Sequence, residues 1–203
     1  LYEKYFLPKL LDFCCGMEGF NNKRSQIVPL AYGKVLEIGI GSGLNFEHYN
    51  FANIVEIIGV DPALSSIAIA KSRAAHCNSK ISFIESSAES IDLTSSSFDC
   101  VVIGYSLCTI PNPLKALSEA HRLLKPKGCL LFLEHGLAPE KKIQNWQHRL
   151  TPAWKKICGG CNLNRNIEEL IQDSGFKFEQ LTKKYIKGPK IAAFQYYGKA
   201  IKT

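Results

Sequence analysis

The sequence lacks a long run of uncharged residues. Its longest such run, residues 100–114, is too short to cross a bilayer and is interrupted by Gly104, Pro111 and Pro113. We therefore expect no transmembrane helix. The cytoplasm is the expected compartment, and peripheral contact with a membrane surface is the alternative that the sequence leaves open.

Internal repeats and low-complexity tracts are also absent. The 203 residues are 46% hydrophobic and 21% charged, which is the composition of a globular protein. A chain of this length buries enough apolar surface to fold as one domain. We predict a single domain over residues 1–203, with a helical lead-in over 1–33 and the core over 34–203.

The eight cysteines lack the spacing of a metal-binding motif. Cys158 and Cys161 form one C-x-x-C pair, but no second pair accompanies it, and Cys14 and Cys15 are adjacent rather than spaced. In a chain of this size cysteines more often behave as small buried hydrophobic residues. We therefore expect reduced thiols, a structural Cys161 and no metal site.

The net charge of +7 is not accompanied by aromatic residues interleaved with basic ones, as RNA-binding surfaces require. Nucleic acid is therefore not an expected partner, and a small-molecule acceptor is. Several lysines lie between residues 177 and 202. We interpret them as the solvated face of a hairpin, with contact to an anionic surface as the alternative.

Short β-rich runs alternate with helical segments from about Lys34 onward. The runs are residues 35–38, 57–60, 81–84, 100–103 and 129–133. Asn112 with Pro113, and Asn166 with Glu169, are helix-start signals. Residues 176–184 and 191–199 then predict an antiparallel hairpin. The expected fold class is α/β, a Rossmann-like doubly wound sheet of seven strands, mixed because of this hairpin.

The most informative segment is residues 35–46, VLEIGIGSGLNF. A strand leads into Gly39, Gly41 and Gly43, and a helix is expected to begin directly after them. Glycines allow a sharp turn and the close approach of a ligand to the backbone. A helix N-terminus behind the turn would favour negative groups. The alternative is a tight strand-to-helix turn in a domain that binds nothing.

Asp61 ends the next predicted strand, 22 residues after Gly39. At that spacing a carboxylate accepts hydrogen bonds from ribose hydroxyls in dinucleotide-binding folds. The nicotinamide fingerprint needs a third glycine where this chain has Leu44. Glu37 would repel a pyrophosphate but attract the cationic methionyl end of S-adenosyl-L-methionine. A protein that binds S-adenosyl-L-methionine is therefore the first hypothesis. An NAD(P)-dependent oxidoreductase is the second.

Five motifs between residues 35 and 134 carry a resemblance: VLEIGIGSG, GVDP, SSAESI, SFDCVVIGYSLCTI and LLKPKGCLLFLEH. They resemble the class I methyltransferases that depend on S-adenosylmethionine, including the ubiquinone and menaquinone branch. The resemblance implies that Asp61 holds the ribose, that Pro62, Ala88 and Glu89 surround the adenine, and that Ser106 and Leu107 flank the methionine. The expected cofactor-binding set is Glu37, Gly39, Ile40, Gly41, Gly43, Asp61, Pro62, Ala88, Glu89, Ser106 and Leu107.

Motifs later in the chain resemble one particular group of these methyltransferases. EHG at 134–136, WQH at 146–148, PAW at 152–154 and GCNLNR at 160–165 look like the methyltransferase-like seven group. Mammalian members of that group are alkyl thiol S-methyltransferases at lipid surfaces. The resemblance implies a small, fairly apolar acceptor, with a thiol favoured. Other acceptors, a quinone precursor or a lipid head group, remain open, as does a non-catalytic domain that only binds S-adenosylmethionine.

Methyl transfer from a sulfonium is an in-line displacement that needs alignment more than it needs a dedicated base. His135 follows the fifth predicted strand, whose carboxyl end faces the ligand crevice in such sheets. It is our first candidate for an acceptor-side base or orienting group. Bonding of His135 to a neighbouring loop is the alternative. Tyr105 is the second catalytic candidate, and His148 is weaker.

Overall fold

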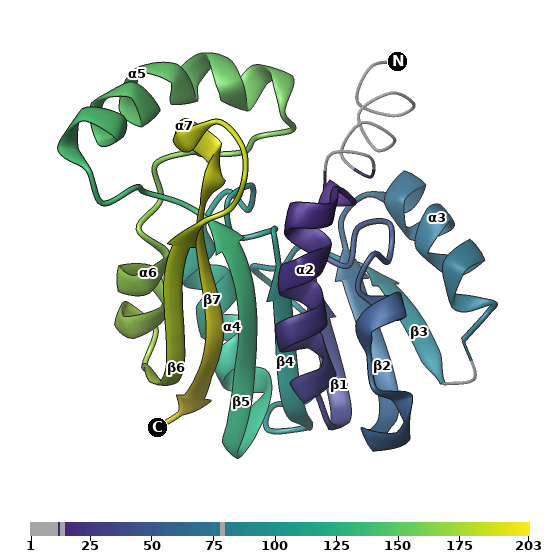
Figure 1. Ribbon diagram of the computed structural model, residues 1–203. Coiled ribbons are helices and arrows are strands. Elements are labelled where there is room, and N and C mark those ends of the chain that lie inside the picture. The colour runs from purple at the N-terminus through teal and green to yellow at the C-terminus, as the bar shows by residue number, and fades with distance from the viewer. Residues whose placement is uncertain (1–11, 13–14, 78–79) are drawn as a thin grey trace.

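The computed structural model describes residues 12, 15–77 and 80–203. Its centre is a seven-stranded sheet in the order β3-β2-β1-β4-β5-β7-β6. The first five strands are β1 (Gly33–Ile38), β2 (Ile54–Asp61), β3 (Ile81–Glu85), β4 (Phe98–Gly104) and β5 (Leu124–His135). They run parallel, so their carboxyl ends meet at one edge, uppermost in Figure 1. This confirms the doubly wound α/β class.

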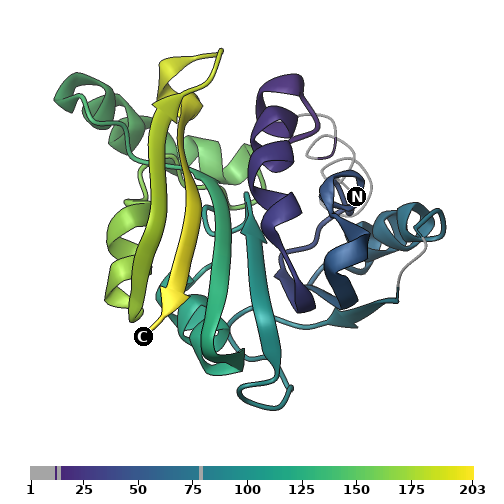
Figure 2. The same cartoon turned by 60° about the horizontal axis from the view of Figure 1, so that its bottom comes forward.

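The last two strands complete the predicted hairpin. β6 (Phe176–Tyr185) pairs antiparallel with β7 (Phe194–Lys202), and β7 pairs antiparallel with β5. β7 therefore lies between β5 and β6, as Figures 1 and 2 show. The sheet is mixed, as the sequence predicts.

Helices cover both faces of this sheet. One core cluster includes residues of α2 (Glu18–Ile27) and α3 (Leu64–Ala74), and α2 crosses the front of the sheet in Figure 1. The opposite cluster includes residues of α4 (Pro113–Leu123) and α6 (Ile167–Asp173). α5 (Lys141–Ile157) lies beyond the carboxyl ends of the strands. Burial on two faces explains the continuous apolar runs in the central strands, such as residues 101–103 of β4 and 130–133 of β5.

The two predicted helix starts are confirmed. The Asn112 side chain accepts a hydrogen bond from the Lys115 N–H at 3.1 Å, and Pro113 occupies the first turn of α4. The Asn166 side chain accepts one from the Glu169 N–H at the start of α6. Each cap satisfies a backbone donor that the helix itself leaves unpaired.

Other boundaries differ from the predictions. The helix expected directly after the glycine loop does not form, and only a single 3-10 turn, Phe46–His48, stands there. Phe46 in this turn and Tyr49 directly after it are three residues apart and both are buried. One turn is therefore enough to bury them. No α-helix N-terminus therefore stands behind this loop to favour a negative group.

Two strand boundaries were also wrong. β5 begins at Leu124 rather than at residue 129, so Pro126 and Gly128 lie inside the strand. The hairpin connection contains the short helix α7 (Lys190–Ala193), so β7 starts at Phe194 instead of Ile191. Pro189, whose ring restricts φ, stands immediately before that turn of helix.

The predicted lead-in helix was based on Tyr5, Phe6, Leu10 and Phe13, which lie outside the described residues. Within the described part of the chain, no helix is both long enough and apolar enough to pass through a bilayer.

Candidate active site

The three loop glycines have different local tasks. Their φ angles are 72°, 54° and 80° for Gly39, Gly41 and Gly43, in the left-handed region that suits glycine. A Cβ on Gly39 would lie 2.4 Å from the Ser106 Cβ, and one on Gly43 would lie 2.6 Å from the Phe46 ring. Among the described residues, a Cβ on Gly41 would meet nothing closer than 4.0 Å. Gly39 and Gly43 allow packing, whereas Gly41 borders open space.

Asp61 is placed beside this loop by the end of β2. Its Oδ2 accepts a hydrogen bond from the Gly41 N–H at 3.0 Å, and its Oδ1 accepts one from the Ala63 N–H at 2.8 Å. Burial raises the pKa of Asp61, against these two backbone hydrogen bonds. The structure thus joins the two sequence signals, the middle glycine and the acidic residue, through one hydrogen bond.

The remaining predicted cofactor residues lie around the same edge of the sheet. Pro62 is exposed next to Asp61, while Ala88 is buried in the segment after β3. The Glu89 carboxylate accepts a hydrogen bond from the Asn112 N–H. Ile40 is buried, and its side chain packs where a Cβ on Gly59 would stand. The Ile40 side chain therefore packs against β2, and its backbone forms part of the glycine loop.

Glu37 is engaged inside the protein. Its side chain is 1% exposed, its Oε1 accepts a hydrogen bond from Asn45 Nδ2 at 2.8 Å, and its Oε2 accepts one from the Tyr49 hydroxyl at 2.7 Å. Burial raises the pKa of Glu37 to about 7. Arg24 of α2 donates to Asn45 Oδ1 at 3.0 Å. No pattern in the sequence indicated Arg24, Asn45 or Tyr49.

The loop after β4 is fixed by a carboxylate that sequence reasoning missed. Glu134, fully buried near the end of β5, accepts hydrogen bonds on one oxygen from the Ser106 and Leu107 N–H groups, both at 2.7 Å. Its other oxygen has no partner among the described residues. Burial raises the pKa of Glu134 to about 7. Ser106 also donates to the Ile38 carbonyl at 3.1 Å.

Tyr105 is covered by α2. The Phe20 ring lies edge-on to it at 4.9 Å between centroids, and the Arg24 guanidinium lies 5.0 Å from its ring centroid. Its φ of 57° is unusual for a residue with a side chain and indicates local strain. Burial raises the pKa of the Tyr105 phenol far above its ordinary value. Tyr105 therefore remains protonated near neutral pH.

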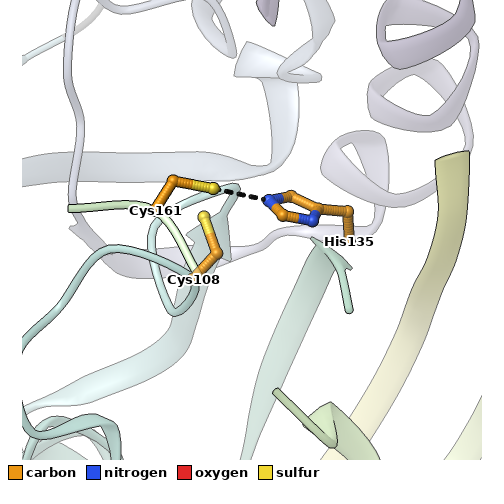
Figure 3. A group of neighbouring side chains, drawn as sticks. All are labelled: Cys108, His135 and Cys161. Carbon is orange, nitrogen blue, oxygen red and sulfur yellow. Dashed lines mark hydrogen bonds between the residues drawn. The ribbon is translucent and has the colours of Figure 1, made fainter. Parts of the chain in front are cut away.

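His135, the last residue of β5, faces two thiols (Figure 3). Its Nε2 lies 3.1 Å from Cys161 Sγ, and Cys108 points into the same space. All three side chains are buried. His135 therefore contacts a neighbouring loop, as the alternative interpretation expected, and its acceptor-side role stays a prediction. A hydrogen bond from Cys108 and the neighbouring His135 lower the pKa of Cys161 to about 4, against burial.

The loop that carries Cys161 is held on the loop after β4. The Asn162 N–H donates to the Cys108 carbonyl at 2.8 Å, and Arg165 donates to the carbonyls of Leu107 and Ile110. Local spacing could not reveal this cluster, because its members come from three separate segments. Cys158, the other half of the C-x-x-C, does not belong to it.

Comparisons with known proteins agree with this geometry. The family model described as "Methyltransferase domain" matches residues 36–132. Thiol S-methyltransferase TMT1A from Homo sapiens is 31% identical over 192 residues, which cover 91% of this chain and 77% of that protein. Thiol S-methyltransferase TMT1B from Rattus norvegicus is 35% identical over 150 residues, and the match spans 72% of this chain and 61% of that protein.

A solved structure supports the fold. N-methyltransferase NodS from Bradyrhizobium japonicum WM9, in complex with S-adenosylhomocysteine, has a TM-score of 0.71 at 16% sequence identity. The superposition covers 97% of this chain and 92% of that one. With the glycine loop, Asp61 and the seven-stranded sheet, these likenesses place the chain in the class I methyltransferases that use S-adenosylmethionine as their cofactor.

Proposed function

We propose that this protein transfers the methyl group of S-adenosylmethionine to the sulfur of a small, fairly apolar thiol. The observation that carries the proposal is the 31% identity with thiol S-methyltransferase TMT1A. That match extends over 91% of the chain and therefore reaches beyond the sheet, into the segments that surround His135 and Cys161. A likeness limited to the cofactor half would support methyl transfer without favouring an acceptor.

The residues present fit the proposed cofactor. Gly41 leaves open space at the loop, as close approach of a ligand to the backbone requires. Asp61 holds its carboxylate beside that space, and each oxygen, with one backbone partner, has a further lone pair for a ribose hydroxyl. Ala88 and Glu89 follow β3, where the adenine would lie, and Ser106 and Leu107 would flank the methionine.

Glu37 has a less direct role than its charge alone suggests. Both of its oxygens have protein partners, so we propose that it acts through Asn45 and Tyr49, which it orients. In its ionised form Glu37 still favours a cationic ligand over a pyrophosphate. Arg24, bonded to the same Asn45, partly balances that charge.

When bound, S-adenosylmethionine supplies a methyl group on a positively charged sulfur. The protein must then hold the acceptor thiol in line with it and remove the thiol proton. A free thiol has a pKa of about 8.5, so an electropositive or proton-accepting neighbour yields enough thiolate. His135 is the proposed acceptor-side residue that orients the thiol or takes its proton. Tyr105 stays protonated and would donate a hydrogen bond.

The test is an acceptor panel. The purified protein is incubated with methyl-labelled S-adenosylmethionine and, separately, an alkyl thiol, the matched alcohol, a phenol and an amine. Labelled thioether and S-adenosylhomocysteine should form with the thiol, at a rate at least about tenfold above the other acceptors. Methylation confined to the phenol or the amine would refute the thiol assignment. Cofactor binding with no turnover on any acceptor would favour a non-catalytic domain.

A further inference from the structure

The cluster of Cys108, His135 and Cys161 has a composition that the proposed chemistry does not require. One sulfur comes from the loop after β4, the imidazole from the end of β5 and the second sulfur from the loop before α6. Their candidate ligand atoms all lie within 4.8 Å of one another (Figure 3). Two thiols and an imidazole are the soft donors that zinc prefers.

The spacing suits one metal ion. Typical zinc bonds of about 2.3 Å to sulfur and about 2.0 Å to nitrogen, at tetrahedral angles, put sulfur about 3.6 Å from nitrogen. His135 Nε2 and Cys161 Sγ are 3.1 Å apart, so a shift of about half an ångström would admit the ion. His135 Nδ1 has no partner among the described residues, so no hydrogen bond there fixes the ring against this shift.

Charge and support also favour an ion here. Two thiolates and a neutral imidazole balance a divalent cation, so the loaded site would be neutral and could remain buried. The two loops that carry the sulfurs are tied together by Arg165 and by the Asn162 N–H. The two loops are therefore held together by hydrogen bonds that do not depend on an ion.

We propose that Cys108, His135 and Cys161 bind one zinc ion, with a fourth coordination position open to the acceptor. Three protein ligands and an open position are the pattern of catalytic zinc sites, whereas structural sites use four. Cys108 directly follows Leu107, which is expected to flank the methionine, and on this ground the open position is proposed to lie on the acceptor side. This second part rests on the proposed function, whereas zinc binding does not.

The chemistry of the open position follows from the charge of the ion. An alkyl thiol that binds there loses its proton to solvent and is held as a thiolate next to the methyl donor. The thiolate then forms the new sulfur–carbon bond as the sulfonium–methyl bond breaks, and the electron pair of that bond stays on the departing sulfur. In this account His135 is a ligand and no longer needs to act as a base.

The first measurement is metal content and cobalt substitution, without cofactor or turnover. The full chain, purified under reducing conditions, should hold about one zinc per molecule. Loading the zinc-free protein with Co²⁺ should give thiolate-to-cobalt charge-transfer absorption and the visible bands of a tetrahedral ion. Cys161→Ser and His135→Gln should each weaken cobalt binding by at least about 100-fold, since even outer partners of a ligand are worth 10–100-fold.

Two control variants separate ligand loss from damage to the fold. Cys129→Ser removes a buried thiol that lies 3.5 Å from Cys100 Sγ. Cys129 does not belong to the group formed by Cys108, His135 and Cys161. Cys158→Ser removes the other half of the C-x-x-C. Both should keep the cobalt spectrum. A wild-type protein without bound zinc or cobalt absorption, or with a Cys108–Cys161 disulfide under reducing conditions, would overturn the site.

The second measurement tests the open position. Adding an alkyl thiol to the cobalt protein should intensify and shift the charge-transfer band, and the matched alcohol should not. An unchanged spectrum would refute thiol ligation even if the ion is bound. Thiol methylation by a metal-free protein would overturn the role of the ion toward the acceptor while leaving zinc binding and the proposed function intact, so the failures are distinguishable.

Discussion

Substitutions at Gly41 test the cofactor-binding site most directly. Its absent side chain leaves space that neither Gly39 nor Gly43 leaves, since their neighbours are packed against them. Gly41→Ala should weaken S-adenosylmethionine binding by at least about tenfold, and Gly41→Val by about 100-fold, because a side chain would stand where the ligand approaches. Titration calorimetry measures both.

Part of any loss at Gly41 would come from its φ of 54°, which costs a non-glycine residue about 1–2 kcal/mol. Gly175 is the matched control, because its φ is 81°, and a Cβ there would meet His121 at an unstrained 3.5 Å. Gly175→Ala should lower stability by a similar amount and leave the affinity unchanged. Equal affinities in all these variants would remove Gly41 from the site.

The raised pKa of Glu37 predicts that the stability of the protein depends on pH. It holds its proton more tightly in the folded state, with a pKa of about 7 against an ordinary 4.5, because it is buried. Its contribution to the free energy of unfolding therefore falls as the pH rises from about 4.5 to about 7, by up to about 3 kcal/mol. Glu37→Gln, which stays neutral, should lose less stability across this interval.

The measurement is chemical denaturation of both proteins at pH 5 and pH 7.5 without cofactor. The difference between the two proteins isolates Glu37, because every other titrating group is shared. A Glu37→Gln variant whose stability falls as steeply as that of the wild type would show that Glu37 is ionised throughout.

At the scale of elements, Glu134 joins β5 to the loop after β4. Glu134→Ala would leave two buried N–H groups without an acceptor and should cost about 2–4 kcal/mol in the free energy of unfolding. Glu134→Gln keeps a carbonyl oxygen for both donors and should cost less than half of that. Denaturant unfolding compares them, and equal losses would mean that the acceptor oxygen is not what holds the loop.

Local patterns in the sequence predicted the elements that depend on local chemistry. Asn112 with Pro113, and Asn166 with Glu169, marked helix starts because caps act within three residues. The pattern failed after Gly43, where a strand–glycine–helix unit was expected and only one 3-10 turn forms. Asn45 lies in that stretch and bonds to Glu37 and Arg24, contacts that no local rule contains.

At the scale of the whole molecule, the sequence could place Gly41, Asp61, Ser106 and His135 at one edge, because carboxyl ends of parallel strands meet there. It could not pair Cys161 with His135 or Glu134 with the Ser106 N–H. The first contact depends on how the segment after α5 folds back over the sheet, and the second on how β5 places Glu134 against the loop after β4. Both are tertiary properties without a sequence period.

Cofactor binding should stabilise the whole fold. S-adenosylhomocysteine at 100 times its dissociation constant adds about 2.7 kcal/mol, which should raise the melting temperature by about 5–10 °C in a chain of this size. Asp61→Ala should abolish most of this rise, because the ribose loses its carboxylate. Asp173→Ala, which removes an exposed carboxylate at the end of α6, should retain it. A full rise in Asp61→Ala would contradict the ribose assignment.

In the proposed function, donor and acceptor meet at the carboxyl edge of the sheet between β1 and β5. A crystal structure of the complex with S-adenosylhomocysteine tests it most directly. We predict ribose hydroxyls on Asp61, the Gly41 backbone against the ligand, and the homocysteine sulfur directed toward Cys108 and His135. A nucleoside bound away from Gly41 and Asp61, or a sulfur directed away from His135, would contradict the account.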